Sequence, residues 1–154
     1  MARNPPTTST FLLANFVPFR LNRLADAVSQ DLSEIYRDRF GLDIPEWRVL
    51  VTVGQRSGCN AQHVAASTRM HKTRVSRAVA SLAERKLVER VSCADDGREF
   101  RLRLTKAGLR VYEVLVPLAL ERERALLAKM SAVNSQGFIA ALSQLEDALK
   151  LNGE

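Results

Sequence analysis

The sequence is short of the residues that build loop-rich, cross-linked or membrane-spanning proteins. Its 154 residues include seven glycines, five prolines and two cysteines, and aromatic residues make up 6%. This composition excludes a collagen-like repeat, a loop-rich all-β protein and a disulfide scaffold. The longest apolar run, residues 114–120, contains Pro117 and is far shorter than the roughly 20 residues that cross a membrane. We therefore predict a cytoplasmic protein without a membrane partner.

Signals for catalysis and for metal binding are also missing. His63 and His71 are eight positions apart with no carboxylate at ligand spacing, and Cys59 and Cys93 do not show the spacing of metal ligands. No serine or cysteine can be grouped with a histidine and a carboxylate from its spacing. The sequence predicts neither an enzyme nor a metal or cofactor site, and we interpret both cysteines as structural or incidental.

Positive charge is present but unevenly distributed. Residues 69–103 hold ten basic and five acidic side chains, so this window carries +5 of the net charge of +6. A local basic excess attracts a polyanion through phosphate contacts and the release of counterions. The alternative is an ordinary solvated surface, and the pattern within the window decides between the two.

Periodicity predicts two helices in the first third of the chain. Apolar residues recur every three or four positions over residues 16–39, and Gly41 ends this amphipathic helix. Asp43 and Glu46, with Pro45 between them, predict a second helix that starts with a capping box. This second helix runs to about residue 55 and is expected to bury Trp47, Leu50, Val51 and Val53.

A short helix, a tight turn and a longer helix follow. Asn60 is the predicted N-cap of the short helix, which ends near residue 67, and the longer helix covers residues 72–85. The inward positions of the longer helix are apolar, namely Val75, Ala78, Val79 and Leu82. Its outward positions are basic or hydroxylated, namely Thr73, Arg74, Ser76, Arg77 and Ser81. This combination is typical of a helix-turn-helix motif.

The next segment predicts a β-hairpin, followed by two helices. Residues 87–93 and 99–104 alternate apolar with polar side chains around a turn signal at residues 94–97. Thr105 is a candidate cap for a helix from residue 106 to about residue 130, in which Pro117 should cause a kink or mark a change in packing direction. A last helix over residues 136–151 carries one stripe of large apolar side chains, namely Phe138, Leu142, Leu145 and Leu149.

This order of elements resembles the winged helix-turn-helix regulators of the MarR family across residues 15–150. Three segments carry the resemblance: the helix start at residues 45–50, the recognition helix and first wing strand at residues 74–90, and the wing tip and next helix start at residues 96–108. The resemblance implies a mainly α fold with a two-stranded wing. It also implies an intertwined helical dimerisation region (11–44 and 106–154) and a DNA-binding lobe (45–105). Residues 1–10, with their prolines, threonines and serine, are predicted to form a flexible tail.

The chain departs from the family pattern at two positions. Lys86 stands where the family usually has glycine, at a left-handed residue after the recognition helix, and this should cost about 1 kcal/mol. The wing signature Asp-Arg-Arg is Asp96-Gly97-Arg98 here, so one basic side chain is missing from the wing tip.

The resemblance implies a homodimer that binds a pseudo-palindromic operator in double-stranded DNA, with half-sites about 34–36 Å apart. Arg74 and Arg77 would bind guanine edges or phosphates, and Thr73 and Ser76 would contact phosphates or bases. Asn60 and Lys72, at helix N-termini, would favour phosphate. At the wing, Arg98 would enter the minor groove and Asp96 would restrain the wing.

Residues 36–47 look similar to regulators of aromatic-acid catabolism, which implies release from DNA by a small aromatic acid or its CoA thioester. Arg37 and Arg39 would hold CoA phosphates, while Arg20, Trp47 and Tyr112 would line an aromatic pocket. The alternative is that Trp47 is core and the arginines are a solvated helix end. A ligand-responsive repressor is the leading interpretation. An activating or sequence-tolerant DNA-binding protein and a dimeric interaction module without DNA are the others.

Overall fold

Six α-helices and one antiparallel hairpin form the part of the chain that the computed structural model describes, residues 11–56, 58–92 and 100–151. This matches the predicted mainly α class with a two-stranded wing. A 3-10 helix, η1, precedes the first α-helix. In chain order the elements are η1 (Leu13–Asn15), α1 (Val17–Phe40), α2 (Ile44–Gly54), α3 (Ala61–Thr68), α4 (Lys72–Glu84), β1 (Val88–Ser92), β2 (Phe100–Leu104), α5 (Lys106–Leu127) and α6 (Ala132–Ala148).

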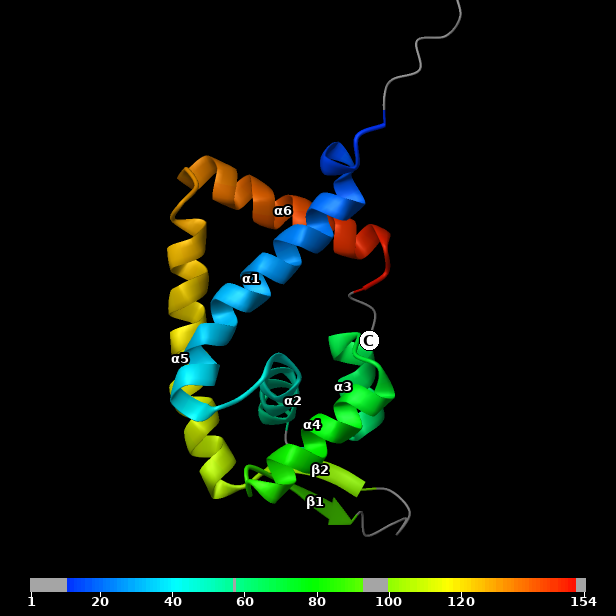
Figure 1. Cartoon of the computed structure of the whole chain (residues 1–154), viewed down its shortest axis with the longest axis vertical. Coiled ribbons are helices and arrows are strands. Elements are labelled where there is room, and N and C mark those ends of the chain that lie inside the picture. The colour runs from blue at the N-terminus through cyan, green and yellow to red at the C-terminus, as the bar shows by residue number, and fades with distance from the viewer. Residues whose placement is uncertain (1–10, 57, 93–99, 152–154) are drawn as a thin grey trace, which may run out of the picture.

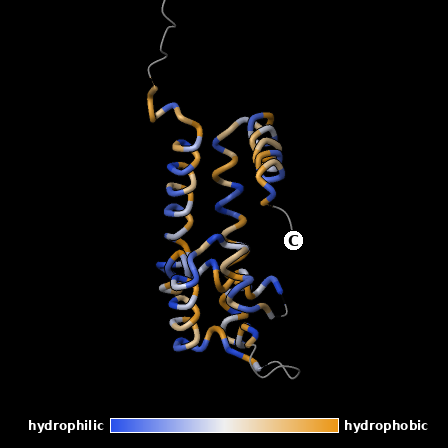
Figure 2. The backbone as a smooth tube through the Cα atoms, turned by 90° about the vertical axis from the view of Figure 1, so that its right-hand side faces the viewer, coloured by the Kyte–Doolittle hydropathy of each residue, from blue (hydrophilic) through white to orange (hydrophobic). Residues whose placement is uncertain are grey.

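The molecule has a lower lobe and an upper set of long helices (Figure 1). The lobe contains α2, α3, α4 and the hairpin, while α1 and α5 run upward from it side by side. Seen from the side, α1, α5 and α6 are separate from one another in the upper region (Figure 2). The first and last thirds of the sequence therefore meet in the upper region, and the middle third forms the lobe.

The hydrophobic core occupies the lobe and reaches the lower part of α1 and α5. The predicted inward face of α4 is confirmed, because Val75, Ala78, Val79 and Leu82 are all buried. The expectation for α2 was wrong at three positions, since Val49 is fully buried whereas Trp47 and Val51 are half-buried. The capping box fixes where α2 begins, and this start turns residues 46, 49, 50 and 53 toward the core.

The two C-terminal helices differ from the predicted ones in their boundaries. Thr105 caps α5 as expected, with its Oγ1 accepting from the Gly108 amide at 3.0 Å. Pro117 lies inside α5, which continues past it to Leu127. The last helix begins at Ala132 rather than at residue 136, because the Ser131 hydroxyl accepts from the Asn134 amide and supplies an N-cap that the apolar stripe does not reveal. No described residue of α6 is buried.

Other predicted helix ends are confirmed in atomic detail. The Asp43 side chain accepts from the Glu46 amide and the Glu46 side chain accepts from the Asp43 amide, each at 2.8 Å. Gly41 ends α1 with a φ of 58°. Asn60 Oδ1 accepts from the His63 amide at 2.8 Å and so caps α3. Short-range side-chain chemistry therefore sets these boundaries.

The end of α4 forms a Schellman turn around Lys86. The Leu87 amide donates to the Leu82 carbonyl at 2.8 Å, and the Lys86 amide donates to the Ala83 carbonyl at 2.9 Å. Lys86 has a φ of 57°, which is the left-handed conformation expected from its place in the family pattern. A Cβ atom is strained there, whereas glycine is not.

Replacing Lys86 with glycine should raise the free energy of unfolding by about 1 kcal/mol, because the turn keeps its geometry and loses the Cβ strain. Urea denaturation followed by circular dichroism measures this change. Lys86→Ala is the matched control, since it removes the same lysine side chain but keeps the Cβ. Equal stability of the glycine and alanine variants would contradict the assignment of strain to this residue.

Candidate nucleic-acid interface and adjoining cavity

One face of α4 is anchored and the opposite face is free. With Val75, Ala78, Val79 and Leu82 buried in the core, most of the other positions of α4 are exposed to solvent. The exposed side chains on that face are Lys72, Thr73, Arg74, Ser76 and Arg77. The structure thus gathers five of the predicted DNA-contacting residues on one rigid surface. Ser81 was wrongly expected outside, because its hydroxyl instead donates to Glu46 Oε1 on α2.

A groove runs from this surface to the hairpin, and we call it the α4–wing groove. It is about 450 Å³ in volume, and Lys72 and Ser76 form its α4 side. Arg90 and Phe100, both exposed on the strands, form the other side. Sequence reasoning placed Arg90 on the hairpin but did not bring it and Phe100 to α4. Strand alternation was the available signal, because it puts both side chains on one face.

The hairpin carries further positive charge at defined register positions. Arg90 is opposite Leu102 and Glu89 is opposite Arg103, with Leu102 buried beneath the wing. Cys59 extends the sheet, since it exchanges two backbone hydrogen bonds with Leu102. Burial raises the pKa of the Cys59 thiol, which fits a structural role. Among the other predicted residues, Asp96, Arg98 and Cys93 lie outside the described residues.

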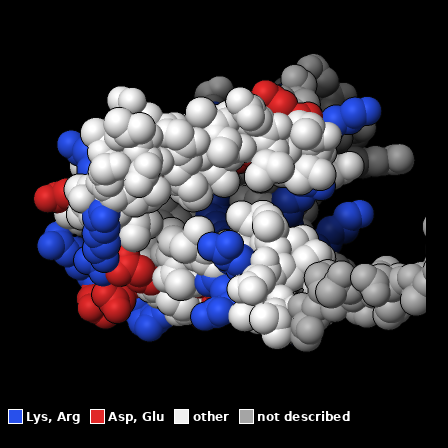
Figure 3. All heavy atoms as spheres, turned by 90° about the horizontal axis from the view of Figure 1, so that it is seen from above, with Lys and Arg blue, Asp and Glu red and all other residues white. Residues whose placement is uncertain are grey.

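A cavity of about 640 Å³ opens above the lobe, and we call it the interhelical cavity. It is bounded by α1, α2, α5 and α6, and most of its wall is apolar. From above, the end of the molecule shows two ridges of mainly uncharged side chains with a hollow between them (Figure 3). Trp47 and Tyr112, two of the predicted ligand residues, both line this cavity.

Packing holds the two aromatic side chains of the interhelical cavity in place. The Trp47 ring stacks on Tyr36 with centroids 5.3 Å apart and an interplanar angle of 9°. Burial raises the pKa of Tyr36 to about 12, so this ring stays neutral at physiological pH. Tyr112 lies on Gly54 of α2, where a Cβ would come within 2.5 Å of the Tyr112 ring. The cavity wall is thereby in contact with the lobe.

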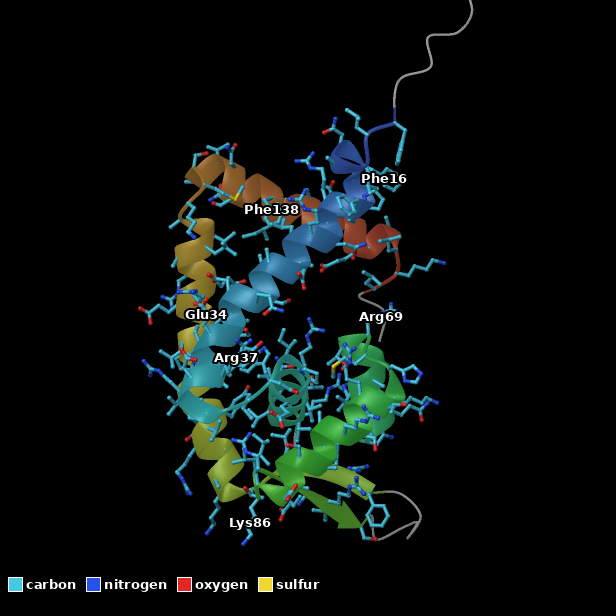
Figure 4. The ribbon with its side chains drawn as sticks, viewed as in Figure 1. Phe16, Glu34, Arg37, Arg69, Lys86 and Phe138 are labelled. Atoms are coloured by element: carbon cyan, nitrogen blue, oxygen red, sulfur yellow. The ribbon has the colours of Figure 1, made fainter. Side chains whose placement is uncertain are left out.

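The predicted arginines do not join Trp47 and Tyr112. Arg37 is exposed near the end of α1 and donates to Ser33 Oγ at 2.8 Å (Figure 4). Arg39 lines a separate hollow between α1 and α5, and Arg20 lines another one near the start of α1. The reason is helical geometry, because each residue turns the helix by about 100°. Side chains that follow closely in sequence therefore leave α1 in different directions.

A different arginine reaches the interhelical cavity. Arg122 of α5 forms two hydrogen bonds with the Asp31 carboxylate of α1, at 2.7 and 2.9 Å, and a third with Glu34 at 3.1 Å. Its guanidinium lowers the pKa of Asp31, mainly through the hydrogen bond. Arg122 is the one cation that lines the cavity within the described part of the chain. Sequence reasoning missed this pair, because its partners are 91 positions apart.

The described residues contain neither a candidate metal site nor a candidate membrane span. No group of three histidine, cysteine or acidic side chains is placed to hold a metal ion. No described helix is long and apolar enough to cross a membrane.

Comparisons with known proteins agree with this architecture. A family model described as "MarR family" matches residues 40–99. The HTH-type transcriptional repressor IacR of Pseudomonas putida is 22% identical over 112 residues, which cover 73% of this chain and 66% of IacR, just under two thirds of its length.

Solved structures extend the similarity to nearly the whole chain. A MarR/EmrR family transcriptional regulator from Acinetobacter sp. ADP1 is 27% identical with a TM-score of 0.80, covering 91% of this chain and 99% of that one. CouR from Rhodococcus jostii RHA1, bound to p-coumaroyl-CoA, is 20% identical with a TM-score of 0.76, covering 94% and 98%. The family match over residues 40–99, the described winged helix and these similarities lead to one conclusion: the chain is similar to the MarR family of transcriptional regulators, by sequence in the lobe and by fold over nearly its whole length.

Proposed function

We propose that this protein is a repressor that binds a pseudo-palindromic operator in double-stranded DNA as a homodimer. The observation that carries the proposal is the surface of α4, where basic and hydroxyl side chains are exposed opposite a buried apolar face. A helix of this kind fits the major groove, where Arg74 and Arg77 can bind base edges or phosphates. Lys72, Thr73 and Ser76 would then contact the backbone or bases.

The flanking groups would complete the DNA interface. Asn60 uses its carbonyl oxygen to cap α3, which leaves its side-chain NH2 group for a phosphate. Arg98 is proposed to enter the minor groove from the wing tip, with Asp96 restraining the wing. Arg90, at the α4–wing groove, adds a positive charge between the recognition helix and the wing.

A homodimer would cover the apolar surface of the upper helices. Large apolar side chains are exposed near the start of α1 and along α6, and the described part of a single chain leaves them uncovered. The most exposed of these are Phe11, Leu12, Val17, Val133 and Leu149. Two-fold pairing through this surface would present two copies of α4 to successive major grooves.

Selection from random double-stranded DNA tests the DNA-binding proposal directly. Full-length protein is incubated with the library, and bound duplexes are recovered and sequenced over several rounds. We expect one pseudo-palindrome whose half-site centres are about one helical turn apart. Gel shift with the selected duplex and with a scrambled duplex then measures specificity. Recovery of no common sequence, or of a single unpaired half-site, would contradict the proposal.

The effector is proposed to be an aromatic acid or its CoA thioester, which binds in the interhelical cavity and releases the DNA. A volume of about 640 Å³ falls in the range of sites for small organic ligands. Trp47 and Tyr112 offer aromatic surface. Arg122 donates to Asp31 and Glu34 through Nε and Nη2, and its Nη1 would donate to a ligand carboxylate. For a thioester, Arg37 and Arg39 are proposed contacts of the CoA phosphates, and Arg20 remains a proposed contact of the bound ligand.

Titration of the protein–DNA complex with free aromatic acids and their CoA thioesters tests the effector. We expect at least one thioester to release the selected duplex. The proposed reason is that the thioester binds more tightly to the dimer when the spacing of its two recognition helices does not match the operator. Replacing both Arg37 and Arg39 with alanine should weaken the thioester and leave the free acid unaffected. If no compound of the panel binds the protein or releases the DNA, the effector proposal is wrong. If the double variant keeps the wild-type affinity for the thioester, Arg37 and Arg39 do not contact the CoA phosphates.

A further inference from the structure

Three helix ends meet in the lobe around one buried carboxylate. Glu46, in the first turn of α2, has an exposed fraction of 8%. One of its oxygens accepts from the Asp43 amide, and the other accepts from the Ser81 hydroxyl of α4. The carboxylate therefore joins the start of α2 to the last turn of α4.

Arg85 continues this connection from α4 to α1. Its guanidinium donates to the Gly41 carbonyl at 3.2 Å and to the Phe40 carbonyl, and it lies 3.8 Å from Glu46 Oε2. These carbonyls belong to the end of α1, where backbone acceptors lack helical partners and the helix dipole favours a cation. We call Glu46, Ser81, Arg85 and the two carbonyls the helix-end network.

The helix-end network connects two elements that are otherwise separated. α2 lies between α1 and α4, which share little direct packing (Figure 1). Under the proposed function, α1 belongs to the dimerisation region and α4 enters the DNA. The position of α4 relative to the dimer axis then depends on α2, on the hydrogen bonds of Arg85 and on those that Thr105, before α5, makes with the end of α4.

We propose that Arg85 is a positioning residue that sets the spacing of the two recognition helices by tying the end of α4 to the end of α1. This inference rests on the proposed function, because spacing matters only in a dimer that spans two half-sites. Arg85 acts here through backbone carbonyls of its own chain and not through DNA. Its loss should therefore impair the simultaneous engagement of two half-sites and spare the engagement of one.

The binding test compares two duplexes: the full pseudo-palindrome selected by the wild-type protein, and a duplex with one of its half-sites. For Arg85→Met, which keeps the length and removes the hydrogen bonds, we expect about tenfold weaker binding to the full duplex and less than about twofold change on the half-site. Arg85→Lys should recover part of the loss by donating to one carbonyl. Arg110→Met, at an exposed arginine of α5, controls for the loss of one positive charge.

A second measurement does not involve DNA. A nitroxide at Ala80→Cys, on the exposed side of α4, in a Cys93→Ser background reports the distance between recognition helices in the dimer by pulsed electron resonance. We expect Arg85→Met, and more weakly Ser81→Ala, to broaden or shift this distribution, whereas Arg110→Met leaves it unchanged. Thermal melting shows whether each variant is folded. If Arg85→Met does not fold, the distance measurement is made on Ser81→Ala instead.

The outcomes separate this inference from the proposed function. Equal losses on both duplexes would mean that Arg85 contacts phosphate or supports folding only, and would overturn the inference. If Arg85→Met leaves the distance distribution between the two recognition helices unchanged, the inference is wrong, whatever the DNA-binding test shows. If no duplex is selected at all, the proposed function fails, and the distance measurement still decides whether Arg85 positions α4.

Discussion

Replacing Gly108 with alanine is expected to lower the free energy of unfolding by about 3 kcal/mol, at the upper end of the cost of overpacking. A Cβ at this position would lie 1.9 Å from the carbonyl oxygen of Leu87 and 2.9 Å from its carbonyl carbon. These are backbone atoms, so no side chain can rotate away. The start of α5 would have to move off the turn that joins α4 to β1.

The same region explains why this clash cannot relax locally. Thr105 Oγ1 caps α5 and also donates to the Lys86 carbonyl at 2.6 Å, while the Thr105 amide donates to the Leu87 carbonyl at 3.1 Å. Any shift of α5 therefore breaks hydrogen bonds to the end of α4. DNA affinity should fall together with stability.

Urea denaturation of the Gly108→Ala variant measures this effect, and Gly137→Ala is the matched control. Gly137 lies inside α6, and a Cβ there meets no described atom within 4 Å. Alanine is the better helix former, so the control should gain roughly 0.5–1 kcal/mol. If both variants keep wild-type stability or change in the same direction, the close approach of α5 to Leu87 is not a constraint on folding.

Replacing Arg74 or Arg77 with alanine should weaken binding to the selected operator by about 1–3 kcal/mol for each residue. Both side chains are exposed on α4, so their removal exposes no core and leaves the helix in place. Titration by fluorescence anisotropy at fixed salt gives the affinity, and the circular dichroism spectrum should match that of the wild type.

The ratio of affinities for the operator and for a scrambled duplex distinguishes contacts with bases from contacts with phosphates. A variant that loses a base contact should discriminate less between the operator and a scrambled duplex, whereas one that loses a phosphate contact should weaken both equally. Arg110→Ala, on α5, removes an exposed arginine outside the proposed interface and should change affinity little. Wild-type operator affinity in both α4 variants would refute the assignment of α4 as recognition helix.

Local chemistry made the helix ends predictable. The capping box at Asp43 and Glu46, the glycine after α1 and the caps at Asn60 and Thr105 all depend on neighbours within a few positions. The inward face of α4 followed from periodicity in the same way. Even the strained conformation of Lys86 could be expected, because its position in the family pattern calls for a left-handed residue.

Features that depend on distant parts of the chain were not predictable. Ser81 was expected outside because its partner Glu46 is 35 positions away, and Arg122 was overlooked because Asp31 is 91 positions away. Arg37 and Arg39 were expected beside Trp47 since they precede it closely in sequence. Their true directions depend on how α1 is rotated against its neighbours, and no single-helix pattern contains that rotation.

Because α6 has no buried residues, the amount of active regulator in a cell should depend steeply on the concentration of the protein. An isolated helix of this length is marginal in water, so in the proposed dimer α6 owes its stability to the second chain. Below the dimer dissociation constant, a monomer would lose secondary structure as well as a partner, and residues 132–148 would be open to proteases. Degradation would then remove monomers first. A modest fall in synthesis would be amplified into a larger fall in active regulator.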